Sequence, residues 1–472
     1  MAASKPMTLL CLEAVLQNME PNLRFRLAQH CPAISSIEKQ LPLHIKSLKL
    51  SEYEFTVNDT NYRLGVYQDY PDGLRIPDAV KELNDEGGEQ LDLDKYGIKT
   101  YSQPAELTPG DIEINNANPL RKPLFTPRIR RMERRLGEYE SALARRNRSR
   151  PSSPETNYSP GSSPDYRNRS PRPGSRSYSP CSPGGSRRAS PVYTSSPNYS
   201  PCEAETDLDR CTDMTLQEKV HSKNAELLPF LMRRDGEEPS WSLFAQLTIS
   251  KDESKVIYRG RYTTLAQNMK SLYTFFFGSR KSPIKIDKLS IDCIHYDAVL
   301  RLPENLKFKV SSLKLKKKSQ NICEALTPII CESSFPLQHV EVVNLGDHPW
   351  IRTARSLKVI VDYPTLATTQ YILSLECEKL KLKDRYSTFT VIDCIPLIEQ
   401  WLKTGKTAGT CYEFSVPTTD LDILKGIANR FNGEYKDRAA RIPMNEFGLE
   451  LHLDYITGDK ITFKMEVKQN YL

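Results

Sequence analysis

The chain has 472 residues, of which 38% are hydrophobic and 26% are charged, and its formal net charge is +7. This length and composition suffice for two or three globular domains. The eleven cysteines are scattered without a C-x-x-C pair, which favours reduced thiols in a cytoplasmic or nuclear protein over a disulfide-stapled secreted one. No apolar stretch approaches membrane-spanning length and the start of the chain does not resemble a signal peptide, so we expect no membrane partner.

Apolar residues in the first forty positions recur at helical spacing, which predicts three short helices. The first ends at Pro21, and the others fit Leu23–Gln29 and Ala33–Lys39. The period then changes to two, which predicts three strands. These strands are His44–Leu50, Glu54–Val57 and Tyr62–Tyr67. With the loop-rich stretch that follows, they indicate a first domain over residues 1–127.

Residues 128–148 form a basic segment with a helical pattern. Its apolar residues recur at three and four positions, as in a coiled-coil seam, and arginines cover the other faces. The apolar positions are Ile129, Met132, Leu136, Tyr139 and Leu143. Two interpretations stay open: an amphipathic helix that packs on its own chain, and the seam of a coiled-coil dimer.

Residues 149–205 form a tract rich in Ser, Pro and Arg that we expect to be disordered. Leu, Ile and Phe are absent from Ser149–Pro201, so burial cannot offset the entropy of ordering. Nine serines precede prolines and resemble proline-directed phosphorylation sites. The phosphorylation candidates are Ser153, Ser159, Ser163, Ser170, Ser179, Ser182, Ser190, Ser196 and Ser200.

The positive charge is concentrated in these two segments. Residues 128–148 carry eight Arg and three Glu, and residues 149–201 carry seven Arg, one Glu and one Asp, so each segment has a net charge of +5. The rest of the chain therefore sums to 7 − 10 = −3. An Arg-rich tether with interleaved tyrosines is able to bind RNA weakly and nonspecifically, so an RNA- or chromatin-associated factor is the first alternative function.

The second half begins with a helical connector over residues 206–235, followed by a domain over residues 236–472. A hairpin over Leu243–Arg259 offers strands that could extend the small N-terminal sheet. Beyond it, strand-like and helix-like stretches alternate, with spacings too uneven for a strict leucine-rich repeat. We expect an α+β or α/β fold, with a degenerate, leucine-rich-repeat-like curved sheet and helices on one face.

Several short segments resemble a known family when they are taken in order. They are Pro21-Asn22-Leu23-Arg24-Phe25-Arg26, Leu41-Pro42-Leu43, Asn61-Tyr62, Gly65-Val66-Tyr67, Asp72-Gly73, Leu91-Asp92-Leu93-Asp94-Lys95-Tyr96-Gly97, Thr108-Pro109-Gly110-Asp111, Ile291-Asp292, Leu300-Arg301-Leu302-Pro303, Ser334-Phe335-Pro336-Leu337 and Gly409-Thr410. Together they resemble the nematode-expanded F-box C proteins, whose shared region is a domain of unknown function. The resemblance covers most of both folded halves, and it implies little about activity, since most members of the family lack an assigned one.

The resemblance also implies a degenerate F-box-like element at Pro6–Lys39, which would dock on the adaptor subunit of a cullin-type ubiquitin ligase. The candidate adaptor-binding residues are Leu9, Leu10, Val15, Leu16, Met19, Leu23, Phe25 and Leu27. The alternative is that these helices cap the following sheet and bury the same residues within the chain.

No constellation of residues predicts catalysis, a cofactor or a metal. Gly405-Lys406-Thr407 lacks the earlier glycine of a phosphate-binding loop and fits a helix end. His348 fits a loop histidine with a satisfied ring, and Asp92 and Asp94 fit loop caps rather than calcium ligands. We therefore expect a non-enzymatic interaction protein, with the RNA-associated factor and an enzyme of unrecognised class as alternatives.

Overall fold

The computed structural model describes residues 8–100, 107–115, 125–149, 212–293, 297–386, 388–444, 448–457 and 460–469. These residues divide into two compact units. Met1–Pro123 and Met232–Leu472 belong to the first unit, and Leu124–Leu231 to the second. The nine phosphorylation candidates and the tract that holds them lie outside the described residues.

The first unit opens with the three short helices that the spacing predicts. They are α1 (Leu9–Asn18), α2 (Pro21–His30) and α3 (Pro32–Gln40). Local chemistry fixes where each begins, because the Thr8 side chain caps α1 and the Glu20 side chain caps α2. Pro21 and Pro32 occupy first helical positions, where the missing amide proton costs nothing.

The two sequence halves share one sheet in this unit. The N-terminal strands are β1 (His44–Leu50), β2 (Glu54–Val57) and β3 (Thr60–Asp69), and the later hairpin is β5 (Ser242–Lys251) and β6 (Ser254–Arg261). Strand β3 pairs antiparallel with β5 along its length, and β1 pairs parallel with β7 (Ile284–Ile291). The expected extension of the N-terminal sheet by the hairpin is confirmed.

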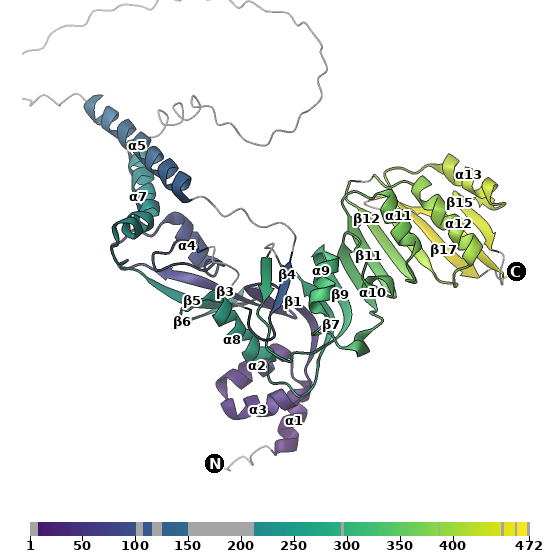
Figure 1. The fold of residues 1–472 in the computed structure, drawn as a ribbon, viewed down its shortest axis with the longest axis horizontal. Helices are drawn as coiled ribbons and strands as arrows, with labels where there is room; N and C mark the ends of the chain where they lie inside the picture. The colour runs from purple at the N-terminus through teal and green to yellow at the C-terminus, as the bar shows by residue number, and fades with distance from the viewer. Residues whose placement is uncertain are drawn as a thin grey trace, which may run out of the picture. The chain divides into compact units, whose positions relative to one another are not determined.

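Within the described residues, the sheet has 15 strands in the order β14-β15-β16-β17-β13-β12-β11-β10-β9-β7-β1-β2-β3-β5-β6 (Figure 1). Its central strands are parallel, and antiparallel strands continue it at both ends. The central strands not yet bounded are β9 (Phe308–Lys318), β10 (His339–Val343), β11 (Ser356–Val361), β12 (Lys379–Asp384) and β13 (Cys411–Ser415). The C-terminal strands are β14 (Glu434–Lys436), β15 (Ala439–Met444), β16 (Leu449–Ile456) and β17 (Thr462–Gln469).

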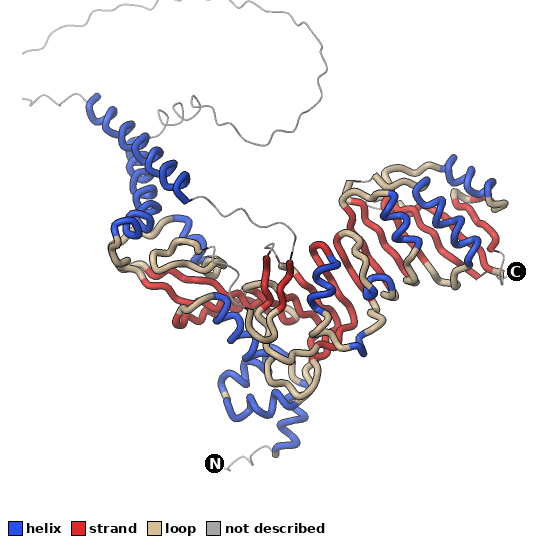
Figure 2. Tube along the Cα trace, viewed as in Figure 1, coloured by secondary structure: helices blue, strands red, loops and turns tan. Residues whose placement is uncertain are grey.

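Helices connect the central strands and lie on one side of the sheet (Figure 2). They are α8 (Leu265–Phe277), α9 (Ser319–Leu326), α10 (Pro349–Arg352), α11 (Leu366–Leu373), α12 (Ile395–Thr404) and α13 (Leu421–Arg430), with 3-10 turns at Glu332–Ser334 and Ile392–Cys394. The α+β fold with a large mixed sheet agrees with the expected class. The elements that the sequence did not predict are short: α4 (Asp78–Asp85), β4 (Ile112–Asn115), β8 (Asp297–Leu300), α10, β14 and β15.

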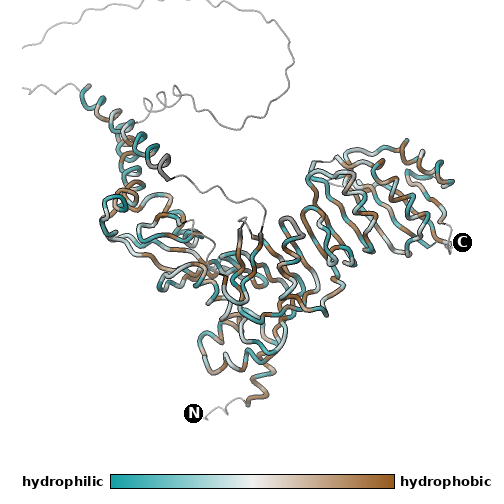
Figure 3. The backbone as a smooth tube through the Cα atoms, in the orientation of Figure 1, coloured by the Kyte–Doolittle hydropathy of each residue, from teal (hydrophilic) through white to brown (hydrophobic). Residues whose placement is uncertain are grey.

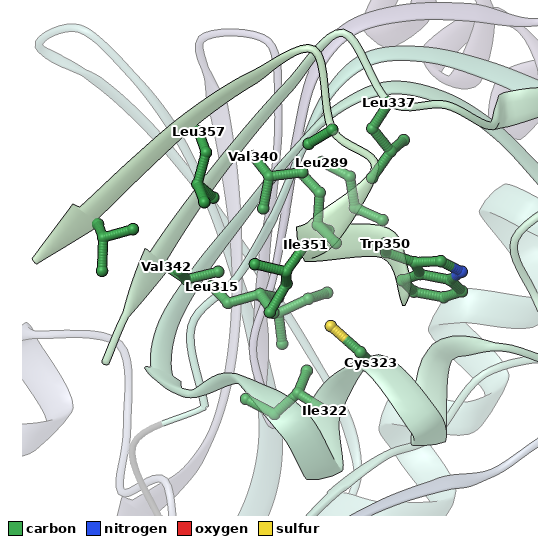
Figure 4. Packing of buried hydrophobic residues seen from close by; sticks show 14 of the residues in the cluster. Leu289, Leu315, Ile322, Cys323, Leu337, Val340, Val342, Trp350, Ile351 and Leu357 are labelled. Atoms are coloured by element: carbon green, nitrogen blue, oxygen red, sulfur yellow. The ribbon is translucent and has the colours of Figure 1, made fainter. Parts of the chain in front are cut away.

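The core lies between the sheet and these helices. Figure 4 shows Leu289, Leu315, Val340, Val342 and Leu357 pointing from neighbouring strands toward α9 and α10. Burying such side chains is worth about 1.5–3 kcal/mol each. The hydropathy of the strands accordingly alternates along the chain (Figure 3). At the N-terminal end, α8 contributes Tyr273, Phe276 and Phe277, which pack on Phe55 and Phe25.

The second unit contains helix α5 (Phe125–Ser149) and most of α7 (Asp213–Asp235). The two helices contact each other: Arg146 Nη1 lies 3.4 Å from Asp213 Oδ1, and Lys219 Nζ lies 5.9 Å from the centre of the Tyr139 ring. Ala142 is buried and Leu136 is half-buried, so the apolar stripe is in use within the chain. This packing agrees with the amphipathic-helix interpretation, and the dimer seam remains an expectation.

Candidate interaction surface

The central parallel strands have two different faces. Strand β12 is the simplest case, since Lys379, Lys381 and Lys383 are exposed while Leu380 and Leu382 are buried. Parallel strands joined by right-handed crossovers place their connecting helices on the same side of the sheet. The leucine side therefore carries the helices, and the lysine side carries none of those that connect these strands (Figures 1 and 2).

The strand register brings lysines of separate strands into rows. In one row Lys314, Glu341, Lys358, Lys381 and Glu413 follow one another across β9 to β13. Neighbouring strands are about 4.8 Å apart, so these side chains form a ladder. The term "lysine face" denotes here the outward lysines of β1, β7, β9, β11 and β12. They are Lys49, Lys285, Lys288, Lys309, Lys314, Lys316, Lys358, Lys379, Lys381 and Lys383.

Carboxylates on the same side neutralise only part of this charge. Glu341 Oε1 lies 2.8 Å from Lys314 Nζ and 3.2 Å from Lys358 Nζ, and Glu413 Oε2 lies 2.6 Å from Lys381 Nζ. Asp292 and Asp287 add two more negative charges, paired with Lys49 and His44 respectively. Glu54 of β2 lies 3.9 Å from Lys49 as well, so ten lysines against five carboxylates give 10 − 5 = +5.

Half of the lysines have no ion-pair partner in the part of the chain that the structure describes. They are Lys285, Lys288, Lys309, Lys379 and Lys383, and all five are exposed. An unpaired surface ammonium keeps its hydration and is available to an incoming anion. The lysine face is therefore an open basic surface.

Two groups on β10 report the electrostatics of this face. Burial acts to raise the pKa of Glu341, but its hydrogen bonds and charge interactions with Lys314 and Lys358 outweigh it, so the pKa is lowered. The pKa of His339 is also lowered, chiefly by burial; the charge of Glu341 acts to raise it, and the charges of Lys358, Lys288 and Lys314 act to lower it. The lowered pKa of Glu341, a carboxylate favoured as the anion despite its burial, indicates a positive local field.

Exposed tyrosines lie at the carboxyl ends of β11 and β12. The rings of Tyr363 and Tyr386 stack with their centroids 4.7 Å apart, although Tyr363 is 69% exposed and Tyr386 is 54% exposed. They border a hollow of about 650 Å³ that also contains Asp362 and Arg385, whose charged groups are 3.0 Å apart. Ala367, Thr368 and Tyr371 of α11 line the same hollow, so the rings lie where the strands run into this helix. Exposed rings supply apolar contact area for a bound partner.

Residues 264–418 match the family model of a domain of unknown function, DUF3557. This DUF3557 region runs from the cap of α8 to just beyond β13, so it contains every strand of the lysine face except β1. No curated protein matches the chain. No solved structure matches it either. Among the described residues, no helix is both long and apolar enough to cross a bilayer.

The predicted adaptor-binding residues divide into two groups. Leu16 and Phe25 are buried, and the Phe25 ring packs edge-on against Phe276 at 4.8 Å. Met19 and Leu27 are half-buried. The remaining candidates are exposed: Leu9, Leu10, Val15 and Leu23. The helices therefore use one side to pack within the chain and leave a second apolar side uncovered by described residues.

A buried charge cluster attaches these helices to the rest of the unit. Glu38 of α3 pairs with Arg24 of α2 at 3.0 Å and with Arg280, which follows α8, at 2.9 Å. All three side chains are almost fully buried, and burial lowers the pKa of both arginines. Breaking such a cluster would leave an uncompensated buried charge, so it holds α2 and α3 firmly against the α8–β7 loop.

Two of the segments that carry the family resemblance contact each other in the structure. Asp111 of the Thr-Pro-Gly-Asp segment lies 2.7 Å from Arg301 and 2.8 Å from Lys270. Burial acts to raise the pKa of Asp111, but hydrogen bonds from Lys270, Thr108 and Arg301 lower it. This pairing joins the Thr108–Asp111 segment to the Leu300–Pro303 segment, so these motifs hold the two sequence halves together.

Asp92, Asp94 and His348 make the loop and cap hydrogen bonds that the sequence predicts for them. Asp92 accepts hydrogen bonds from the Tyr262 hydroxyl and the Leu265 amide, at 2.8 and 2.6 Å. Asp94 accepts from the amides of Tyr96 and Ile98. His348 Nδ1 accepts from the Trp350 amide at the start of α10. In the described ranges, no group of three or more metal-ligating side chains comes together.

Gly405 also agrees with its sequence interpretation, since it ends α12 with a φ of 74°. The feature that sequence reasoning missed is the lysine face. Its signal was visible as strict alternation of Lys and Leu, most clearly over residues 379–383. Alternation predicts a strand with one covered side, and lysine at every uncovered position indicates the charge of that side.

Proposed function

We propose that the chain is a non-enzymatic interaction protein that binds an acidic segment of a partner protein on its lysine face. The observation that carries the proposal is the excess of ten lysines over five carboxylates on a sheet face that the connecting helices do not cover. Lysines on neighbouring strands lie about 4.8 Å apart, which is also the spacing of carboxylates on neighbouring extended strands of a partner. Complementary charge of this kind speeds association and selects partners.

Two details favour a protein partner over a nucleic acid. Glu341 and Glu413 lie within the lysine rows, where they would repel a continuous phosphate backbone but could align with a lysine of a protein partner. The stacked Tyr363 and Tyr386 rings resemble the aromatic residues that dominate protein interfaces. The proposal needs no catalytic residue.

A finer proposal follows from the F-box-like resemblance and the exposed side of α1 and α2. Leu9, Leu10, Val15 and Leu23 would dock on the adaptor subunit of a cullin-type ubiquitin ligase, and the lysine face would recruit the protein to be modified. The buried Leu16 and Phe25 serve the internal packing. This arrangement suits a cytoplasmic or nuclear protein with reduced thiols, and all eight described cysteines are free.

Charge reversal tests the lysine face. Lys288→Glu, Lys379→Glu and Lys383→Glu, combined in one chain, should remove a defined set of acidic partners from affinity purifications analysed by mass spectrometry. These residues are exposed and unpaired among the described side chains, so the fold should be retained. The matched control combines Lys81→Glu, Lys403→Glu and Lys425→Glu on exposed helix positions and changes the net charge equally. Loss of the same partners from both variants, or from neither, would refute the proposal.

The adaptor proposal needs its own variants, because Leu16→Asp or Phe25→Asp would disturb the core. Leu9→Asp with Leu10→Asp should abolish co-purification of the adaptor from a mixture with the adaptor in excess, since these side chains are 57% and 77% exposed. Cys11→Asp, at an exposed position of the same helix, is the control for added charge. Absence of adaptor from the wild-type complex would leave the helices with a structural role alone.

A further inference from the structure

Strand β6 ends the sheet and exposes an unusual amount of backbone and apolar surface. Within the described residues it pairs only with β5, and every one of its residues is exposed (Figure 1). Val256, Ile257 and Tyr258, which are consecutive, are 44%, 43% and 41% exposed. A long edge strand with free amide and carbonyl groups is a template for pairing with another chain.

The two sides of β6 differ in character. Successive residues of a strand point to opposite sides. Val256 and Tyr258 line a hollow of about 310 Å³ together with Leu23 of α2 and Ile249 of β5. Further apolar lining comes from Phe25, Tyr62 and Phe276. This side therefore offers a groove beside the free edge in which these apolar side chains alternate with polar ones, among them Glu20, Arg26 and Lys251.

The opposite side of β6 is basic. It carries Lys255, Ile257, Arg259 and Arg261, and the strand has no carboxylate. The Arg259 guanidinium lies 3.5 Å from the centre of the Tyr67 ring, and its Nε donates to Gln246 Oε1 at 3.0 Å. The Lys255 ammonium donates to the Asp85 carbonyl oxygen. These contacts hold two of the three charges in place on one side of the strand.

We propose that the free edge of β6 binds an extended partner segment in which apolar and acidic residues alternate. Main-chain hydrogen bonds to the edge would add the segment as one more strand. Its apolar side chains would enter the groove beside Val256 and Tyr258, and its carboxylates would meet Lys255, Arg259 and Arg261 on the other side. A strand of the period-two pattern satisfies both sides at once, which a helix or a purely acidic peptide does not.

Charge decides against a second copy of the chain as the occupant. Pairing two β6 strands would bring three basic residues from each copy together with no carboxylate on either strand. Basic residues on an edge oppose such self-pairing and leave the edge to an acidic strand. This site is separate from the lysine face, because β5, β3 and β2 lie between β6 and β1, the nearest strand of that face.

Fluorescent peptides of defined pattern test the proposal with the full chain. The probe is an eight-residue peptide that alternates Val and Glu, and its binding is followed by fluorescence anisotropy. Two comparison peptides alternate Val and Lys, or place four Val before four Glu. We expect saturable binding of the Val/Glu peptide, with at least tenfold weaker binding of both comparison peptides. Amide hydrogen exchange of β6 should slow in the complex.

Variants of β6 should change this preference in a predictable direction. Combined Lys255→Glu, Arg259→Glu and Arg261→Glu should bind the Val/Lys peptide better than the Val/Glu peptide. Val256→Ser with Tyr258→Ser should weaken binding of either peptide. If the triple variant does not fold, Arg261→Glu alone provides the test, since Arg261 is exposed and has no ion pair among the described residues. This single variant should reduce the preference for the Val/Glu peptide over the Val/Lys peptide.

Three results would overturn the proposal. They are equal binding of the alternating and block peptides, an unchanged preference in both charge variants, and a dimer whose formation blocks the peptide. The lysine-face variant with Lys288→Glu, Lys379→Glu and Lys383→Glu should bind the Val/Glu peptide as the wild type does. Its failure to do so would place the peptide on the lysine face and thereby separate this proposal from the proposed function.

Discussion

Strands β3 and β12 belong to the same sheet but differ in how many of their sides are covered. On β12 one side is buried leucine and the other is exposed lysine. On β3, Tyr62, Leu64 and Val66 are buried on the side of α8, and Gly65 on the opposite side meets the backbone of Gly87 and Gly88. The loop-rich stretch thus covers β3 from the second side. The comparison teaches that a central strand such as β12 keeps one side uncovered, whereas β3 is covered on both sides.

The largest loss of stability should come from filling the space in which the Gly87–Gly88 backbone packs on β3. A Cβ at position 65 would lie 2.5 Å from the Gly87 carbonyl oxygen and 2.7 Å from the Gly88 carbonyl carbon. Gly65→Ala should therefore lower the free energy of unfolding by more than about 4 kcal/mol, measured by urea denaturation. Gly260→Ala on β6 is the matched control, because a Cβ there meets nothing within 4 Å. Similar stability of the two variants would contradict the two-sided cover.

The next effect contrasts the two sides of β12. Leu382→Ala should cost about 2–5 kcal/mol, since the side chain is fully buried and its removal leaves a cavity. Lys381→Ala, one residue away on the uncovered side, should cost less than about 0.5 kcal/mol. Thermal unfolding of both variants measures the difference. Equal costs would mean that the lysine side is packed against something in the free protein.

A pH effect is expected at Glu52, which lies between β1 and β2 where the parallel strands give way to the antiparallel ones. Burial raises its pKa to about 7, against a smaller lowering by a hydrogen bond with Tyr53. The unfolded chain releases this proton at lower pH, so folded stability falls as pH rises from about 4.5 through 7. Glu52→Gln removes this loss.

The stability of Glu52→Gln relative to the wild type should therefore increase by about 3 kcal/mol between pH 4.5 and pH 8. Urea titrations at a series of pH values measure the change. Glu82→Gln on the exposed side of α4 provides the control for the loss of one carboxylate. A flat difference across this pH range would contradict the burial of Glu52.

The sequence predicted most of the long elements, because period and caps are local properties. The three N-terminal helices, the β5–β6 hairpin and the central strands were found from spacing alone. Short elements such as β4 and β8 were missed, since four residues give no clear period and each strand depends on its partner from far along the chain. The same limit applies to the site, because the lysine alternation of residues 379–383 is local but its alignment with Lys314 and Lys358 is set by strand register.

The adaptor candidates show a second limit. Helical spacing placed Leu9, Leu16 and Phe25 on apolar faces, but it did not distinguish the buried Leu16 and Phe25 from the exposed Leu9. That distinction depends on α8, whose Phe276 covers Phe25 from more than two hundred residues away. Burial by distant elements is not encoded in the local period.

The most direct test of the lysine face is a titration with a labelled peptide of ten glutamates at several salt concentrations. Three full-length chains are compared: the wild type, Lys288→Glu/Lys379→Glu/Lys383→Glu, and Lys81→Glu/Lys403→Glu/Lys425→Glu. Both variants change the net charge by the same amount, so long-range attraction is matched. The lysine-face variant should bind at least tenfold more weakly and lose most of the salt dependence, and the helix variant should stay close to the wild type. Equal weakening of both variants would show that the peptide senses overall charge and would contradict the lysine face as the binding surface.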